Sequence, residues 1–331
     1  RRVVTAFIEG YDAVFFDLDG VLYLGPEAVE GAVDGVRRLH EAGVATVYVT
    51  NNAARSTAVV AHHLAELGFG AQEQEVVSSA QAASGLLRQE LPAGSKVLVA
   101  GTDNLVEQVR LAGMEVVTTF AEEPVAVIQG YDPAMTWPRL DQAAIAIQRG
   151  ARWFATNTDS TRPTEHGLVP GAGAAIQAVR NTVDHDPEVV GKPFRPLMDE
   201  ALRRSGAGRP VFVGDRIDTD IMGAHAVGID SFLVFTGAHG VRDLCLAPVD
   251  GRPTAIGWNV ESLFEPRRTA AIADGVATCG AVTVRAVAGN ALLEGDVTKR
   301  EAQLDAAWAL AQLFWDGSVS TGEAVFARCL S

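Results

Sequence analysis

The segment DAVFFDLDGVLY, residues 12–23, joins an apolar run to two carboxylates and decides the fold. Residues 13–16 have the short, continuously apolar pattern of a strand that is buried on both faces of a parallel sheet. Asp17 and Asp19 follow at once, and open parallel sheets bind ligands beyond the carboxyl ends of their strands. The segment therefore predicts a buried strand that carries acidic groups to a binding edge.

Short apolar strands alternate with helical patterns before residue 90 and again after residue 188. Strand-like runs cover 44–50, 211–215 and 231–235, and helical patterns cover about 28–42, 56–67, 196–204 and 219–227. This order is typical of βαβ units. We therefore predict an α/β fold with a doubly wound parallel sheet, formed by residues 1–89 and 189–256.

The residues between these two halves have an alternation of their own, and the C-terminal residues have a different pattern. Residues 90–188 hold strand-like runs at 96–101, 124–130 and 152–157 and a helical pattern near 136–149, which predicts an inserted α/β domain. From residue 257 onward, strand-like stretches precede a helix expected from Lys299 to Phe314. We predict a small α+β module over residues 257–331.

Composition argues against several classes of partner. Acidic residues outnumber basic ones by 41 to 27, and the resulting charge of −14 repels nucleic acid. No apolar stretch reaches the roughly 18–20 residues that a membrane-spanning helix needs, and the first residues lack the apolar core of a signal peptide. We expect a cytoplasmic protein with buried thiols at Cys245, Cys279 and Cys329, because their spacing fits neither a disulfide framework nor a zinc site.

Polar residues follow three of the predicted strands at the ends where ligands bind. They are Asp17 and Asp19, then Thr50, Asn51 and Asn52, and finally Asp215. Carboxylates that meet in a partly dry site repel one another, and a hard cation removes this cost. Mg²⁺ prefers a few carboxylates together with water and phosphate oxygens. We expect Mg²⁺ to be held by the side chains of Asp17 and Asp215 and by the backbone carbonyl of Asp19.

This arrangement suits phosphoryl transfer through a covalent intermediate. Attack by Asp17 on phosphorus would give an aspartyl phosphate, which divides one difficult displacement into two easier steps. Asp19 would protonate the leaving alkoxide and later deprotonate the hydrolytic water. The phosphoryl oxygens would be bound by Thr50, Asn51 and Asn52, and their negative charge would be offset by Lys192.

Four segments resemble the motifs of a known family, the haloacid dehalogenase (HAD) superfamily of phosphatases. They are DLDGVLY (17–23), VTNN (49–52), GKP (191–193) and GDRIDTD (214–220), in the family's order. The insertion between the second and third motifs, with ATNTDSTRPTEHGLVPGAGA (155–174), is similar to the C2 cap of the NagD and 4-nitrophenylphosphatase-like branch. The resemblance implies a phosphomonoester hydrolase with glycerol 3-phosphate as its best-matched substrate, and with phosphoglycolate, pyridoxal phosphate and nucleotides as alternatives.

The resemblance also implies roles inside the insertion and the fourth motif. Residues that would contact the leaving group are Asn157, Asp159, Arg162 and His166. Asp220 matches the last acidic position of the fourth motif, where it is expected to support the metal ligands rather than bind Mg²⁺ itself. Residues 257–331 faintly resemble part of an acetyltransferase-like (GNAT) fold, but RAVAGNA (285–291) departs from the glycine-rich turn that cradles coenzyme A, so we predict a packing or interface module.

Each of these signals has a structural alternative. Thr50, Asn51 and Asn52 suit turns, Lys192 suits an exposed surface, and residues 157–174 suit a polar loop. Two other functions stay open: a phosphotransferase that passes the phosphoryl group to an alcohol, and a receiver-like phospho-accepting module, in which the acidic pair and the phosphorylated aspartate lie on different strands. The expected partner is a small phosphorylated metabolite, and a homodimer is compatible with the sequence.

Overall fold

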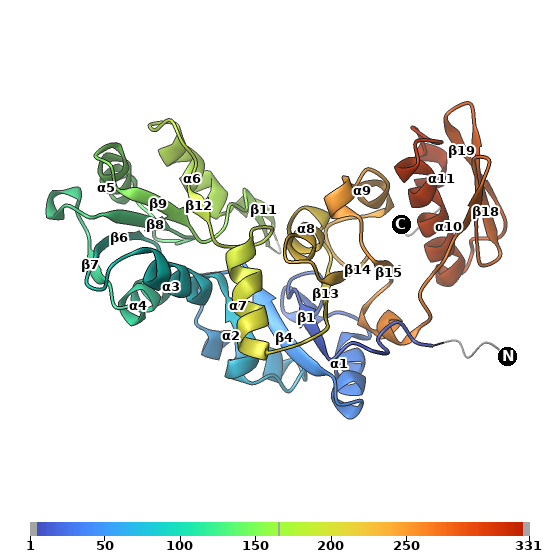
Figure 1. Cartoon of the computed structure of the whole chain (residues 1–331), viewed down its shortest axis with the longest axis horizontal. Helices are drawn as coiled ribbons and strands as arrows, with labels where there is room; N and C mark the ends of the chain where they lie inside the picture. Colours follow the sequence, from blue (N-terminus) through green and yellow to red (C-terminus); the bar gives the residue numbers. More distant parts are fainter. Residues whose placement is uncertain (1–4, 165, 327–331) are drawn as a thin grey trace. The chain divides into compact units, whose positions relative to one another are not determined.

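The computed structural model describes residues 5–164 and 166–326, which fold as two compact units (Figure 1). The first unit lies within residues 1–46 and 208–331, and the second spans residues 47–207. Each unit contains parallel strands with buried apolar side chains. The predicted α/β fold with a doubly wound parallel sheet is therefore confirmed.

Four parallel strands form the sheet of the first unit in the order β15-β14-β13-β1. Their bounds are β1 (Ala13–Phe16), β13 (Pro210–Gly214), β14 (Asp230–Val234) and β15 (Ala255–Gly257). Val14 pairs with Val211, and Val213 pairs with Phe232. Every residue of β1 and β13 is buried, as a strand covered on both faces requires.

The helices of this unit differ from their predicted bounds in two places. The helix expected near 28–42 begins later, as α1 (Ala32–Glu41), because a hairpin of β2 (Tyr23–Leu24) and β3 (Glu27–Ala28) comes before it. The helix expected at 219–227 is a π-helical turn (Ile217–Ile221) that continues into α8 (Met222–Ala226). The remaining helical elements of this part are α9 (Val241–Cys245) and 3₁₀ turns at Val249–Gly251 and Val260–Phe264.

The C-terminal part of the first unit is an antiparallel sheet with a long helix against it. The strands are β16 (Ala271–Ala273), β17 (Val276–Cys279), β18 (Val282–Val287) and β19 (Asn290–Glu294), and the helices are α10 (Arg300–Trp315) and α11 (Glu323–Phe326). Figure 1 shows α10 beside β18 and β19. Alternate residues such as Ala277, Cys279 and Val284 are buried in the same hydrophobic cluster as α10. This alternation is the reason why one face of the sheet accepts a helix.

The second unit begins with two pairs of a strand and a helix, of which the first pair was predicted. Its parallel strands β4 (Ala45–Thr50) and β5 (Val76–Ser78) are followed by α2 (Thr57–Glu66) and α3 (Ser79–Glu90), with a 3₁₀ turn at Glu73–Glu75 between them. Ser56 caps α2, since its side-chain oxygen accepts a hydrogen bond from the Val59 amide. Helix α7 (Arg195–Ser205) starts with proline in its first turn, as predicted.

A five-stranded parallel sheet forms the rest of this unit in the order β12-β9-β8-β6-β7. Its strands are β6 (Lys96–Ala100), β7 (Glu115–Val117), β8 (Ala126–Gln129), β9 (Arg152–Ala155) and β12 (Glu188–Val189). The helical elements are α4 (Asp103–Leu111), a 3₁₀ turn (Phe120–Glu122), α5 (Trp137–Gln148) and α6 (Ala172–Arg180). Because β7 and β8 lie on opposite sides of β6, the sheet is doubly wound.

Two expectations from composition can be compared with the described residues. None of the helices in the described ranges is long and apolar enough to cross a membrane. Cys245 and Cys279 are buried free thiols, as predicted, and Cys329 lies outside the described residues.

Candidate active site

Three carboxylates gather at the carboxyl ends of β1 and β13. One oxygen from each of Asp17, Asp215 and Asp220 lies within 4.8 Å of the others. Asp17 directly follows β1, and its amide donates a hydrogen bond to the Val213 carbonyl at 2.9 Å. Asp215 directly follows the neighbouring strand β13. The two acidic strand ends that were predicted to meet therefore lie side by side, because adjacent parallel strands end at the same edge of the sheet.

The carboxylate of Asp215 is held by the loop that follows β14, residues 236–240. The Ala238 amide donates to Asp215 Oδ2 at 2.6 Å, and the His239 amide donates to the Asp215 carbonyl at 3.2 Å. His239 also accepts a hydrogen bond at Nδ1 from the Ile217 amide at 2.9 Å. Asp215 is only 3% exposed, so these hydrogen bonds fix its orientation in a site with little water.

Two glycines leave room for the same carboxylate. A Cβ atom at Gly20 or at Gly237 would overlap the side chain of Asp215. Gly20 also has φ of +85°, a left-handed conformation that favours glycine. The Thr236 hydroxyl donates to the Gly20 carbonyl at 2.7 Å, which ties the first motif to the loop after β14.

Asp220 and Asp19 occupy different environments. Asp220 is completely buried, and its Oδ2 accepts a hydrogen bond from the Arg216 amide at 3.1 Å across the π-helical turn. Asp19 is exposed in the turn after Asp17, where the Gly20 amide donates to the Tyr23 carbonyl at 2.8 Å. A carboxylate that is exposed beside the cluster can exchange protons, whereas a buried and hydrogen-bonded one is better suited to support its neighbours.

The donor set of this cluster fits a hard divalent cation. All three side chains offer carboxylate oxygens, which Mg²⁺ prefers, and they lie near enough to share one ion. Two of them are buried, and like charges so close together in a dry site are costly without a cation. The residues present therefore fit Mg²⁺.

The second unit contains the predicted phosphate-binding residues Thr50, Asn51 and Lys192. The Asn51 side chain accepts from the Lys192 amide at 2.8 Å and donates to the Lys192 carbonyl at 3.2 Å. Lys192 is only 3% exposed, so the alternative that it is an ordinary surface lysine is wrong. The Thr50 hydroxyl accepts from the Asn52 amide at 3.0 Å, and Asn52 itself is exposed and accepts from the Ala54 amide. The structure thus brings Asn51 and Lys192 together and keeps Asn52 in a turn.

The four predicted leaving-group residues divide into a connected pair and two exposed side chains. Asn157 is buried, donates to the Asn51 carbonyl at 2.8 Å and accepts from the Asp159 amide at 3.1 Å. Arg162 and His166 are exposed on the hairpin of β10 (Thr161–Thr164) and β11 (Gly167–Pro170). The Arg162 guanidinium lies over the Tyr131 ring, 4.9 Å from its centroid.

Comparison with known proteins places these motifs in a family. Residues 14–115 match the model of haloacid dehalogenase-like hydrolases, and residues 189–263 match a second, HAD-hydrolase-like model. The D-glycerol 3-phosphate phosphatase of Mycobacterium tuberculosis is 42% identical over 270 residues, which cover 82% of this chain and 76% of that protein. This chain belongs to the haloacid dehalogenase-like hydrolases. The predicted family is thereby confirmed.

Solved structures agree with this HAD hydrolase in sequence and in fold. The crystal structure of the glycerol phosphate phosphatase of M. tuberculosis in complex with magnesium has a TM-score of 0.82 and 35% identity, and the match covers 94% of this chain and 92% of that chain. The p-nitrophenyl phosphatase of Archaeoglobus fulgidus has a TM-score of 0.70 and 30% identity, with coverages of 77% and 98%. The predicted likeness to the 4-nitrophenylphosphatase branch is confirmed by this second match.

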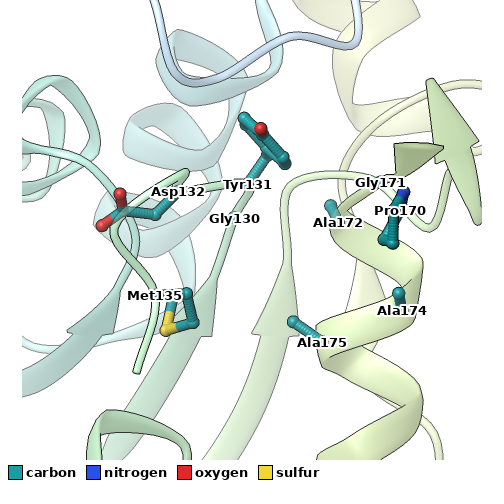
Figure 2. Close-up of a pocket in the computed structure, with 9 residues that line it drawn as sticks. All are labelled: Gly130, Tyr131, Asp132, Met135, Pro170, Gly171, Ala172, Ala174 and Ala175. Atoms are coloured by element: carbon teal, nitrogen blue, oxygen red, sulfur yellow. The ribbon is translucent and has the colours of Figure 1, made fainter. Parts of the chain in front are cut away.

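A small cavity lies in the second unit of this HAD hydrolase, apart from the predicted residues. Figure 2 shows Tyr131 and Met135 on one side of it and Ala174 and Ala175 of α6 on the other. Its volume is about 160 Å³, and none of the predicted site residues is among those that line it. Two predicted residues border it: Arg162 through the Tyr131 ring, and Asp159, whose carbonyl lies close to the lining residue Gly171.

Sequence reasoning missed several residues that position the site of this HAD hydrolase. Ser79 donates its hydroxyl to the Asn51 carbonyl at 2.6 Å, and Thr236, Gly237 and His239 shape the loop around Asp215. The available signal was TGAHG (236–240), a polar, glycine-rich stretch at the carboxyl end of a predicted strand. Such stretches bind ligands in open parallel sheets.

Proposed function

We propose that this protein is a Mg²⁺-dependent phosphomonoester hydrolase that acts through an aspartyl phosphate on glycerol 3-phosphate and releases glycerol and phosphate. The observation that carries the proposal is the cluster of Asp17, Asp215 and Asp220 at the ends of two adjacent strands. The predicted phosphatase class is confirmed, since the similar proteins reported above are phosphatases by name. The choice of Mg²⁺ as the cofactor agrees with the crystal structure of the similar glycerol phosphate phosphatase, which is in complex with magnesium.

The proposed reaction begins with Asp17. Its carboxylate attacks phosphorus, the bond from phosphorus to the glycerol oxygen breaks, and Asp19 gives its proton to that oxygen. Asp19 then takes a proton from water, which attacks the phosphorus of the aspartyl phosphate and releases phosphate and free Asp17. The exposed position of Asp19 supports this exchange of protons.

The metal would be held by the side chains of Asp17 and Asp215 and the backbone carbonyl of Asp19, while Asp220 supports them. When bound, Mg²⁺ supplies positive charge that offsets the charge of the carboxylates and the phosphoryl oxygens. The hydrogen bond from the Ala238 amide keeps Asp215 Oδ2 in one orientation before the ion arrives.

The residues of the second unit would bind the substrate. Thr50, Asn51 and Asn52 would donate to phosphoryl oxygens, and Lys192 would offset their charge. The buried position of Lys192, with its backbone fixed by Asn51, supports a function other than solubility. The glycerol hydroxyls would be contacted by Asn157, Asp159, Arg162 and His166.

Several expectations about organisation belong to the same proposal. Residues 1–89 and 189–256 would form the catalytic core, residues 90–188 the C2 cap, and residues 257–331 a C-terminal module. We also propose a cytoplasmic enzyme of glycerophospholipid metabolism, with a homodimer as a testable assembly. Light scattering of the purified chain measures the assembly, and fractionation of the source cells measures the location.

Phosphate release from a panel of esters tests the substrate. The panel contains both isomers of glycerol 3-phosphate, phosphoglycolate, pyridoxal phosphate and two nucleoside monophosphates, each assayed with Mg²⁺ and again with EDTA. We expect kcat/KM to be highest for a glycerol 3-phosphate isomer and release to stop in EDTA. Equal values across the panel would contradict the substrate, and release only when an alcohol acceptor is added would favour the phosphotransferase alternative.

A further inference from the structure

The C-terminal module shares its core with the residues that flank the metal ligands. A single hydrophobic cluster contains Ile217 and Ile221, which lie beside Asp215 and Asp220 in the sequence. The same cluster contains residues of α9 such as Leu244 and residues of α10 such as Leu310. The module therefore packs on the elements that carry the metal site, all of them within the first unit.

Helix α9 connects the Asp215-binding loop to this module. Residues 236–240, whose Ala238 amide holds Asp215 Oδ2, lead directly into α9, Val241–Cys245. A helix of this length has no stability of its own in water, so contacts with neighbouring elements must hold it in place. The position of α9, and with it that of the loop, must then be set by what contacts the helix.

Trp315 at the end of α10 supplies a directional contact to α9. Its Nε1 donates a hydrogen bond to the Leu244 carbonyl at 3.1 Å. The indole also packs against two neighbours. Trp308 packs edge-on against it with ring centroids 5.6 Å apart and planes at 90°, and the Arg252 guanidinium lies 5.2 Å from its centroid.

We propose that Trp315 is a positioning residue of the metal site. By holding the Leu244 carbonyl, it fixes α9 and thereby the loop whose amide orients Asp215 Oδ2. The proposal rests on the proposed function only in taking Mg²⁺ as the ion that Asp215 binds. It assigns the C-terminal module a part in metal binding, although none of the residues described in it belongs to the carboxylate cluster.

The test compares two substitutions on the same helix. Trp315→Phe keeps an aromatic ring and removes the N–H that binds Leu244. Trp308→Phe makes the same chemical change at a buried position whose indole has no hydrogen bond to α9 among the described residues, so it controls for lost packing. Both variants of the full chain are measured for thermal unfolding, for hydrogen exchange of residues 236–247 without metal, and for Mg²⁺ affinity by calorimetry.

We expect Trp315→Phe to raise the Kd for Mg²⁺ by about threefold to tenfold, the range that the net loss of one ordinary hydrogen bond gives. Exchange of the Ala238 and His239 amides should quicken in the metal-free protein. At saturating Mg²⁺, KM for glycerol 3-phosphate should stay at its original value. Trp308→Phe should lower the unfolding temperature and leave the Kd and these amides unchanged.

Two results would overturn the proposal. One is an unchanged Kd with unchanged exchange in Trp315→Phe, and the other is the same change in both variants, which would reduce Trp315 to ordinary packing. Should Trp315→Phe not fold, Arg252→Met takes its place, because Arg252 covers the indole and donates to the Trp315 carbonyl at 3.5 Å. Neither exchange nor Mg²⁺ affinity depends on turnover, so these readouts hold even if another ester is the substrate.

Discussion

Asn51 and Lys192, which are 141 residues apart in the sequence, exchange two hydrogen bonds that run in opposite directions. The Lys192 amide donates to Asn51 Oδ1 at 2.8 Å, and Asn51 Nδ2 donates to the Lys192 carbonyl at 3.2 Å. One side-chain amide thus satisfies both backbone groups of a buried residue. The direction in which the lysine side chain leaves the backbone is thereby fixed.

The substitution Asn51→Asp should show whether the two hydrogen bonds position Lys192, because it changes the chemistry of the side chain and keeps its size. A carboxylate still accepts from the Lys192 amide, but it cannot donate to the Lys192 carbonyl and places two oxygens face to face. We expect kcat to fall by about tenfold or more, with about 1–3 kcal/mol lost from the free energy of unfolding. Steady-state kinetics and urea unfolding measure both, and Asn181→Ala at an exposed helix end serves as the control. Unchanged kcat in Asn51→Asp would mean that Lys192 needs no such support.

Asp17→Asn should stop turnover and leave the fold intact. An amide is not a nucleophile toward phosphorus, so we expect phosphate release to fall by at least about a thousandfold. The matched control is Asp12→Asn, five residues earlier, whose carboxylate accepts hydrogen bonds from the Gly208 and Arg209 amides. Asp12→Asn should cost about 1 kcal/mol of stability and leave kcat unchanged. Residual turnover of Asp17→Asn near the original rate would remove the aspartyl phosphate from the mechanism.

The substitution Asp215→Asn should remove the stabilisation of the folded protein by Mg²⁺. In the original chain, Mg²⁺ at a hundred times its Kd should raise the free energy of unfolding by about 2.7 kcal/mol, because the ion binds only the folded state. EDTA should reverse this gain. Asp215→Asn should show no gain, and without metal it should be at least as stable as the original, since one of three close carboxylates is gone. Thermal unfolding of the original chain and of Asp215→Asn, each with Mg²⁺ and with EDTA, gives the four stabilities that are compared.

Cys279 should make the protein less stable in alkali. Burial, and then the nearby Asp305 carboxylate, raise the pKa of this thiol from 9.0 to about 12. A raised pKa means that the stability contribution is complete below pH 9 and is lost as pH rises from 9 to 12, because the unfolded thiol ionises first. Cys279→Ser has no such ionisation, so the unfolding temperature of the original should fall relative to that of the variant over this range. A constant difference would contradict the raised pKa.

The strands that carry the site could be predicted because their signals are local. The run at 13–16 is β1 at the predicted bounds, and the expected helix from Lys299 to Phe314 differs by one residue at each end from α10, Arg300–Trp315. Continuous apolar runs and helical periodicity determine these elements wherever they lie in the fold. The acidic ends of two strands were predicted to meet, and they do.

The elements that were missed depend on contacts distant in sequence. The stretch 157–174, for which no strand was predicted, contains a hairpin of β10 and β11, and a proline at 163 hides the strand pattern in the sequence. The predicted helix at 219–227 begins as a π-helical turn, where Asp220 binds the Arg216 amide. His239 could not be assigned either, because its partner Ile217 lies in the π-helical turn after β13. Such pairings need tertiary structure, which local patterns do not contain.

The space around Asp215 has a consequence for how this site tolerates change. Gly20 and Gly237 both lie where a single methyl group would collide with one carboxylate. In a library that samples all twenty amino acids at these two codons, growth that depends on the enzyme should retain glycine alone. Selection at both positions would then preserve the space beside Asp215, so the absence of a side chain at residues 20 and 237 would be as strongly conserved as the aspartate itself.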